Sequence, residues 1–97
     1  MSDLLAIFGP LDSDSELISE ISRLHPRRVT VLIEDVEADW AYDESPAGVE
    51  LRNRLAALMA AIERETGAAV TGLAGSRDQL VGWRFDREVG GRSLIAA

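Results

Sequence analysis

Two turn-forming segments of this 97-residue chain carry residue types that bind phosphate groups in α/β proteins. The first contains Gly9, Asp12 and Ser13, and the second is Gly75-Ser76-Arg77. Where such a loop joins the carboxyl end of a parallel strand to a helix, its N–H groups and the helix dipole favour an anion. The first segment also fits a capping loop, in which acidic side chains stabilise the helix start without a ligand. Both interpretations stay open.

The acids of the first segment do not form a recognisable cation site. Asp12, Asp14 and Glu16 alternate as calcium ligands do, but a calcium loop of the EF-hand type needs glycine at its sixth position and glutamate at its twelfth. Leu17 and Arg23 stand at those positions. We therefore expect no metal and no cofactor, and these carboxylates would repel a phosphate group unless a metal intervened.

Residues suited to catalysis are scarce. With no cysteine and a single histidine, the chain has no thiol nucleophile and no histidine cluster for a metal. Its serines have no neighbouring base motif. Glu34 and Asp35, at the predicted end of a strand, are the candidate bases of an enzyme hypothesis. The residue types favour a non-catalytic protein.

Four of the five aromatic residues fall into two segments of the chain. Trp40 and Tyr42 stand in an acidic stretch, and Trp83 and Phe85 stand near the C-terminus. Aromatic side chains presented on loops often dominate the binding energy of a protein partner. They can equally close the ends of a small core. The acidic stretch, residues 34–50, has seven acids and no arginine, which is more typical of a solvated loop than of a nucleic-acid mimic.

Composition limits the partners that we expect. Hydrophobic residues make up 46% of the chain, so a single folded domain over residues 1–97 is expected. The net charge of −7 disfavours binding to nucleic acid. No apolar run is long enough for a membrane span. Together with the missing cysteines and the acid at position 3, these features predict a cytoplasmic protein.

The apolar pattern alternates strands with helices. Residues 4–8 and 29–33 are continuous apolar runs, typical of strands that are buried on both faces. A serine cap precedes each predicted helix, and the helices end at His25-Pro26 and at Gly67. Residues 68–74 are the third predicted strand. This order predicts an α/β fold with a parallel three-stranded βαβαβ core and Rossmann-like or flavodoxin-like layering.

A change of period follows the third strand. From Val81 to Val89 apolar and polar residues alternate, and Gly90-Gly91 is a dipeptide that favours hairpin turns. Residues 93–97 would then return antiparallel to this segment. We expect a C-terminal antiparallel β-hairpin that extends the sheet.

The apolar strands raise a question about the second face of the sheet. If the strands lie in sequential order, both helices cover the same face. The other apolar face then needs a cover, which a reversed strand order or a second subunit would supply. We expect a homodimer, with the hairpin as a contributor.

The chain resembles a shortened, divergent universal stress protein. Three segments carry the resemblance: the first strand with Asp12-Ser13, residues 28–67, and the strand that ends at Gly75-Ser76-Arg77. The resemblance implies a doubly wound α/β fold that dimerises and, in some members, binds ATP through a G-x-x-G motif followed by G-[ST]. Here Asp78 stands in place of the second glycine, and Phe85-Asp86 replaces the later pair.

These departures imply a member that does not bind ATP, because a carboxylate in place of glycine would block and repel the phosphates. We expect a non-catalytic domain that acts through homodimerisation and protein contacts. The alternative is a small nucleotide- or phosphoester-binding domain that uses the loops after the first and third strands.

Overall fold

The computed structural model describes residues 3–9, 13–34, 46–75 and 77–90. In these ranges the elements are β1 (Asp3–Phe8), α1 (Asp14–Leu24), β2 (Arg28–Glu34), α2 (Pro46–Thr66), β3 (Ala69–Gly75), the short 3-10 helix η2 (Arg77–Leu80) and β4 (Arg87–Gly90). The predicted β-α-β-α-β order is confirmed.

The described strands form one sheet in the order β3-β2-β1-β4. Every neighbouring pair is parallel, so the predicted parallel βαβαβ core is confirmed. The predicted antiparallel hairpin is wrong, because β4 lies beside β1 and runs in the same direction. Residues 93–97, the second half of that hairpin, lie outside the described residues.

Two hydrogen bonds explain why β4 is parallel. The backbone N–H of Asp86 donates to the carbonyl of Asp3 at 2.8 Å. The N–H of Asp3 donates to Oδ2 of Asp86, also at 2.8 Å. These bonds hold the entry to β4 at the amino end of β1, so both strands start at the same edge. The alternating residues from Val81 onward return the chain to that edge, and only Arg87–Gly90 is extended in the sheet.

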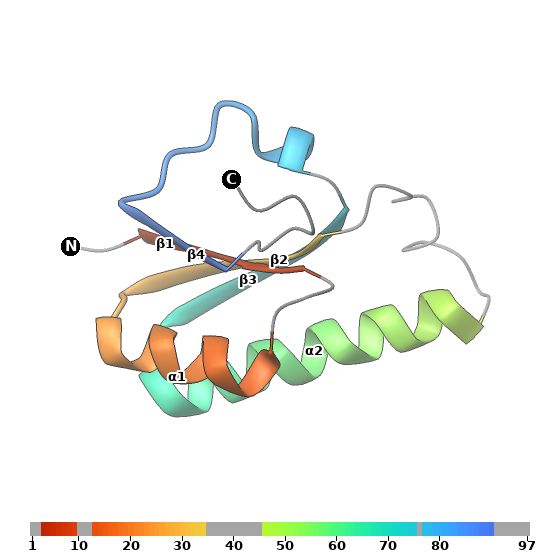
Figure 1. The fold of residues 1–97 in the computed structure, drawn as a ribbon, viewed down its shortest axis with the longest axis horizontal. Coiled ribbons are helices and arrows are strands. Elements are labelled where there is room, and N and C mark those ends of the chain that lie inside the picture. Colours follow the sequence, from red (N-terminus) through yellow and green to blue (C-terminus); the bar gives the residue numbers. More distant parts are fainter. Residues whose placement is uncertain (1–2, 10–12, 35–45, 76, 91–97) are drawn as a thin grey trace.

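Both α-helices cover one face of the sheet, as Figure 1 shows. The main core lies between this face and the helices, and Ala6, Phe8, Ile21, Val31 and Ile62 are completely buried in it. The sequential order β1-β2-β3 accounts for this placement, since each helix connects one strand to its next neighbour. Both helices thus lie on the same face, as the sequential strand order predicts (Figure 1).

The second face is covered by the connection from β3 to β4, drawn in blue above the sheet in Figure 1. Strand order reverses at this point, because β4 returns past β2 to the far side of β1. Leu80 of η2 packs on Leu5, Ile7 and Leu32, and Phe85 adds a partly buried ring. The reversed order thus supplies the cover that a second subunit was expected to give.

Glycine at position 72 explains how α2 fits beneath an edge strand. A Cβ atom built on Gly72 would collide with Sδ of Met59 and would lie 3.0 Å from Cδ1 of Leu55. The missing side chain lets α2 approach β3 closely. Glycine has a low propensity for strands, but at position 72 it allows the helix and the sheet to pack closely.

Candidate functional site

The carboxyl edge of the sheet carries the two glycine segments singled out in the sequence. Gly9 follows β1 and Gly75 ends β3, and both are buried. Strand β2 lies between them, so the two glycines are separated by two strand spacings, or roughly 10 Å. They share an edge but do not form one loop cluster.

A carboxylate stands between the two glycine segments. Glu34 ends β2 and is paired with Gly75 in the strand register. Its side chain is half-buried. Asp35, the other candidate base, lies outside the described residues. The negative charge of Glu34 disfavours an anion at the middle of this edge.

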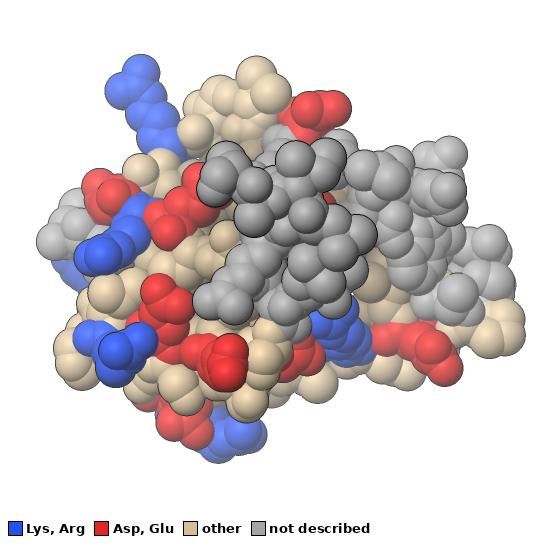
Figure 2. Space-filling model, in the orientation of Figure 1, with Lys and Arg blue, Asp and Glu red and all other residues tan. Residues whose placement is uncertain are grey.

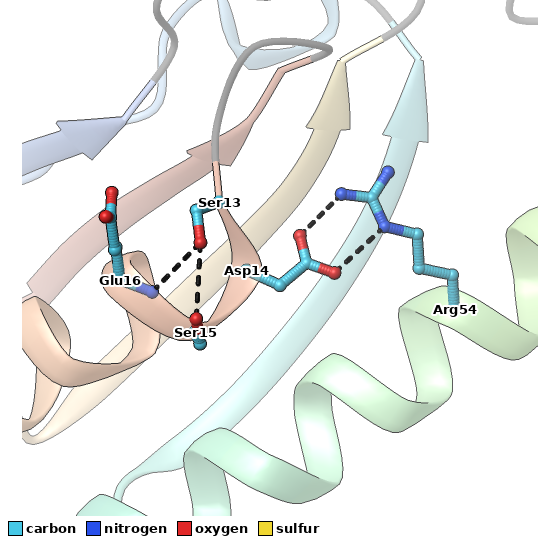
Figure 3. Close-up of polar contacts among 5 residues, drawn as sticks. All are labelled: Ser13, Asp14, Ser15, Glu16 and Arg54. Carbon is cyan, nitrogen blue, oxygen red and sulfur yellow. Dashed lines mark hydrogen bonds and ion pairs between the residues drawn. The ribbon is translucent and has the colours of Figure 1, made fainter.

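The first turn of α1 is organised by its own side chains (Figure 3). Oγ of Ser13 accepts a hydrogen bond from the N–H of Glu16 at 3.4 Å, which is the N-cap contact that the sequence predicts. The same oxygen lies 3.2 Å from Oγ of Ser15. This geometry supports the capping interpretation of the loop. Asp12, the other predicted ligand there, lies outside the described residues.

An ion pair joins this turn to α2. Nη2 of Arg54 donates to Oδ1 of Asp14 at 2.6 Å, and Nε donates to Oδ2 at 3.4 Å (Figure 3). Helical spacing alone would suggest Glu50, one turn before Arg54 in the same helix, as its partner. The two partners stand 40 residues apart, so no local spacing signals their contact.

The strand order creates a second candidate region, which sequence reasoning missed. The order reverses beside β1, and in open α/β sheets ligands bind outside the carboxyl ends of the strands at such a point. A groove of 580 Å³ runs there between α1 and β4, from Ser13 and Gly90 to Arg23. Because the sequence pattern predicts a hairpin in this part of the chain, it does not indicate that β4 lines the groove.

The lining of this groove is polar and mainly acidic. Three serines of α1 or its cap and three glutamates contribute to it, with Arg23 as the cation: Ser13, Ser15, Ser19, Glu16, Glu20 and Glu88. Figure 2 shows acidic and basic side chains interspersed over one face of the molecule. The acidic excess in the groove is unfavourable for a phosphate group without a cation.

Gly75 has a clear role in the chain path. Its φ of 149° is rare for residues with side chains, and a Cβ atom there would collide with the side chain of Gln79. The glycine thus allows the side chain of Gln79, in η2, to lie against the end of β3. Ser76 and the side chain of Arg77 lie outside the described part of the chain.

The two described aromatic candidates lie on the connection between β3 and β4. The Trp83 and Phe85 ring centroids are 6.2 Å apart, with an angle of 34° between the planes. Phe85 packs against the second core, whereas Trp83 is 48% exposed. Val81, two residues earlier, is 81% exposed. Phe85 thus helps to close the core, whereas Trp83 faces solvent.

Trp40 and Tyr42, the remaining aromatic candidates, lie outside the described residues. Within the described part of the chain, no group of three His, Asp or Glu side chains is placed to hold a metal ion. Neither described α-helix has the length and apolar character needed to cross a lipid bilayer.

Comparisons with known proteins add no assignment. The chain matches no family model, no curated protein and no solved structure. The resemblance to universal stress proteins stays a prediction from the sequence.

Proposed function

We propose that the chain forms a cytoplasmic, non-catalytic α/β domain, similar to the universal stress proteins, that acts through homodimerisation and protein contacts. The observation that carries the proposal is the exposure of two apolar side chains, Val81 and Trp83, on the connection between β3 and β4; we call these two residues the patch. Large apolar side chains in such a position favour association, and tryptophan is enriched among residues that dominate binding energy.

The patch is presented by a segment that is attached at both ends. Leu80 is buried against the sheet directly before Val81. Asp86, after Phe85, is bonded to Asp3. A partner that binds this segment has less conformational entropy to remove than it would with a free loop. The patch is therefore suited to specific protein contacts.

The test compares partner capture by the wild type with capture by Trp83→Ala and Val81→Ser. Each protein is coupled to a resin, exposed to extract from the source cells, and the retained proteins are identified by mass spectrometry. We expect one set of proteins to be retained by the wild type and by Arg84→Ala, an exposed neighbour, and to be lost with both patch variants. Equal retention by all four proteins would contradict the role of the patch.

A nucleotide- or phosphoester-binding domain is the second candidate function. The reversal of strand order beside β1 favours it, since this is the position at which open α/β sheets bind ligands. Ser13, which lines the groove beside β1, would lie near such a ligand, whereas Gly75 lies beyond β2 at the end of β3.

Thermal unfolding with Mg-ATP, AMP or GTP distinguishes the two functions. A nucleotide at 100 times its Kd adds about 2.7 kcal/mol to the free energy of unfolding, which raises Tm by several degrees. A rise with one nucleotide would support the second candidate. An unchanged Tm together with a dimer mass would support the first.

A further inference from the structure

The outer edge of β3 lacks the features that normally prevent strands from pairing with another chain. Its seven residues, Ala69–Gly75, contain no charge and no proline. Among the described residues β3 has β2 as its strand neighbour on one side and none on the other. Ala69 and Thr71 are exposed. Natural edge strands are usually short, charged or covered, because an open edge offers unpaired N–H and C=O groups.

The opposite edge of the sheet differs in each respect. Strand β4 has four residues, Arg87–Gly90, and two of them are the charged Arg87 and Glu88. Each copy of the chain carries a net charge of −7, so two copies repel one another over most of their surfaces. The uncharged edge of β3 is a strip on which they can approach.

We propose that a second copy of this chain binds at the β3 edge, with the two β3 strands antiparallel around Gly72. This inference rests on the proposed homodimerisation and assigns its surface. In an antiparallel pair, directly opposed residues have their side chains on the same face of the sheet. When the two strands are copies related by a two-fold axis perpendicular to the sheet, the residue numbers of each opposed pair therefore add to an even total. The pairing centred on Gly72 is the one that uses all seven residues of β3.

In this pairing Thr71 of one copy lies opposite Leu73 of the other on the face that carries η2. Val70 lies opposite Ala74 on the helix face. These side chains are small or apolar, so no like charges meet across the strands. The two sheets join into one continuous sheet.

Helix α2 supplies charge complementarity about the same axis. Leu55 and Met59 contact the position that a Cβ atom on Gly72 would take, so the axis passes beside α2, level with these two residues. Arg52, Ala56, Met59 and Glu63 recur at helical spacing on one flank. This flank faces away from α1, because Arg54 reaches α1 from the other side. Ala56 and Glu63 are exposed, and Arg52 and Met59 are half-buried.

The positions of Arg52 and Glu63 are nearly symmetric about the two residues that lie level with the axis. In the dimer two antiparallel α2 helices therefore place Arg52 of one copy beside Glu63 of the other, and the reverse. The small side chain of Ala56 allows the helices to approach between these two ion pairs. A second copy thus contacts an uncharged strand and a helix flank whose charges are complementary to its own.

The first test uses disulfide formation, because the natural chain has no cysteine. Thr71→Cys and Leu73→Cys proteins are mixed, allowed to exchange subunits and oxidised. Opposed residues have Cβ atoms roughly 4.5–5.5 Å apart, whereas two copies of position 71 are diagonal neighbours at roughly 7 Å. We expect the mixed disulfide, identified by its intact mass, to exceed both self-linked products several-fold.

Arg87→Cys, on the β4 edge, is the matched control. Absence of the mixed 71–73 product in a protein that is dimeric by sedimentation would overturn the β3 interface and leave the proposed function in place. The same holds if Arg87→Cys links efficiently instead. A wild-type protein that is monomeric at all concentrations would overturn both.

The second test exchanges charges on α2 and does not depend on the strand variants folding. Arg52→Glu and Glu63→Arg each bring like charges together, and each should raise the dimer Kd by roughly tenfold. The double variant restores opposite charges and the wild-type net charge, so its Kd should return to near the wild-type value. Single variants with unchanged Kd, or a double variant weaker than both, would contradict the proposed arrangement.

Discussion

Asp14 and Arg54 join the two helices that cover the sheet. Nη2 of Arg54 lies 2.6 Å from Oδ1 of Asp14, and a second bond from Nε makes the contact bidentate. The two side chains are 38% and 42% exposed, so water weakens their attraction. The pair therefore orients α1 against α2 more than it stabilises the fold.

Removing this pair should have a small and coupled effect on stability. We expect Arg54→Met to lower the free energy of unfolding by about 0.5 kcal/mol, the usual value for exposed pairs. Asp14→Asn should lower it by about 1 kcal/mol, because Asp14 also lies in the first turn of α1 and interacts with the helix dipole. Urea denaturation of both variants and the double variant measures the coupling. A double variant that equals the sum of the two losses would show that the pair contributes nothing.

The cap of α1 gives a second prediction. Ser13→Ala removes the oxygen that accepts from Glu16 N–H, and we expect a loss of about 1 kcal/mol, or a fall in Tm of about 4–8 °C for a domain of this size. Ser13→Asp keeps an acceptor and should stay close to the wild type. Ser19→Ala, on the exposed surface of the same helix, is the control. Equal Tm values for the Ser13→Ala and Ser19→Ala proteins would rule out a capping role.

Local signals explain why the first three strands and both helices were predictable. Ser13 at a cap, Pro26 after a helix and the apolar runs of β1 and β2 each act through their immediate neighbours in sequence. The path after Gly75 was not predictable in this way. It depends on hydrogen bonds between Asp3 and Asp86, which are 83 residues apart. In addition, the alternation of apolar and polar residues from Val81 to Val89 does not distinguish a hairpin from a connection between strands.

For the candidate site, too, local features were predictable and long-range features were not. Gly9, Ser13 and Gly75 were correctly expected at strand ends or at a helix start, since loops follow from the order of elements. Their separation by β2, and the groove between α1 and β4, depend on strand order. Strand order is set by long-range pairing, for which one sequence contains no direct signal. The role of Gly72 was missed for the same reason, because Met59 reaches it from a helix.

Two glycines with positive φ should respond differently to substitution. Gly90 has φ 80°, and a Cβ atom there would collide with the carbonyl oxygen of Ile7. Gly82 has φ 90° but nothing lies within 4 Å of its Cβ position. Gly82→Ala should lower the free energy of unfolding by about 1–2 kcal/mol, because alanine is strained at positive φ. Gly90→Ala must in addition displace β4 from β1. In urea denaturation its free energy of unfolding should therefore fall clearly more than that of Gly82→Ala. Equal losses would contradict the packing of β4 beside β1.

Leu80 and Val81 are adjacent residues with opposite environments, and they test the cover on the second face of the sheet. Leu80 is 9% exposed and packs on Leu5, Ile7 and Leu32, whereas Val81 is 81% exposed. Leu80→Ala should lower the free energy of unfolding by about 2 kcal/mol, the lower end for leucine truncation, because the site lies at the border of the core. Val81→Ala should change it by less than about 0.5 kcal/mol.

Hydrogen exchange of the two variants separates a loosened cover from a general loss of stability. In Leu80→Ala the amides of Val81 and Trp83, which are bonded to the carbonyls of Asp78 and Leu80, should exchange faster than those of β2. Val81→Ala should leave both sets unchanged. If Leu80→Ala instead had the stability and exchange pattern of the wild type, η2 would not cover the sheet. The apolar residues Leu5, Ile7 and Leu32 would then need another cover, as the sequence pattern first indicated.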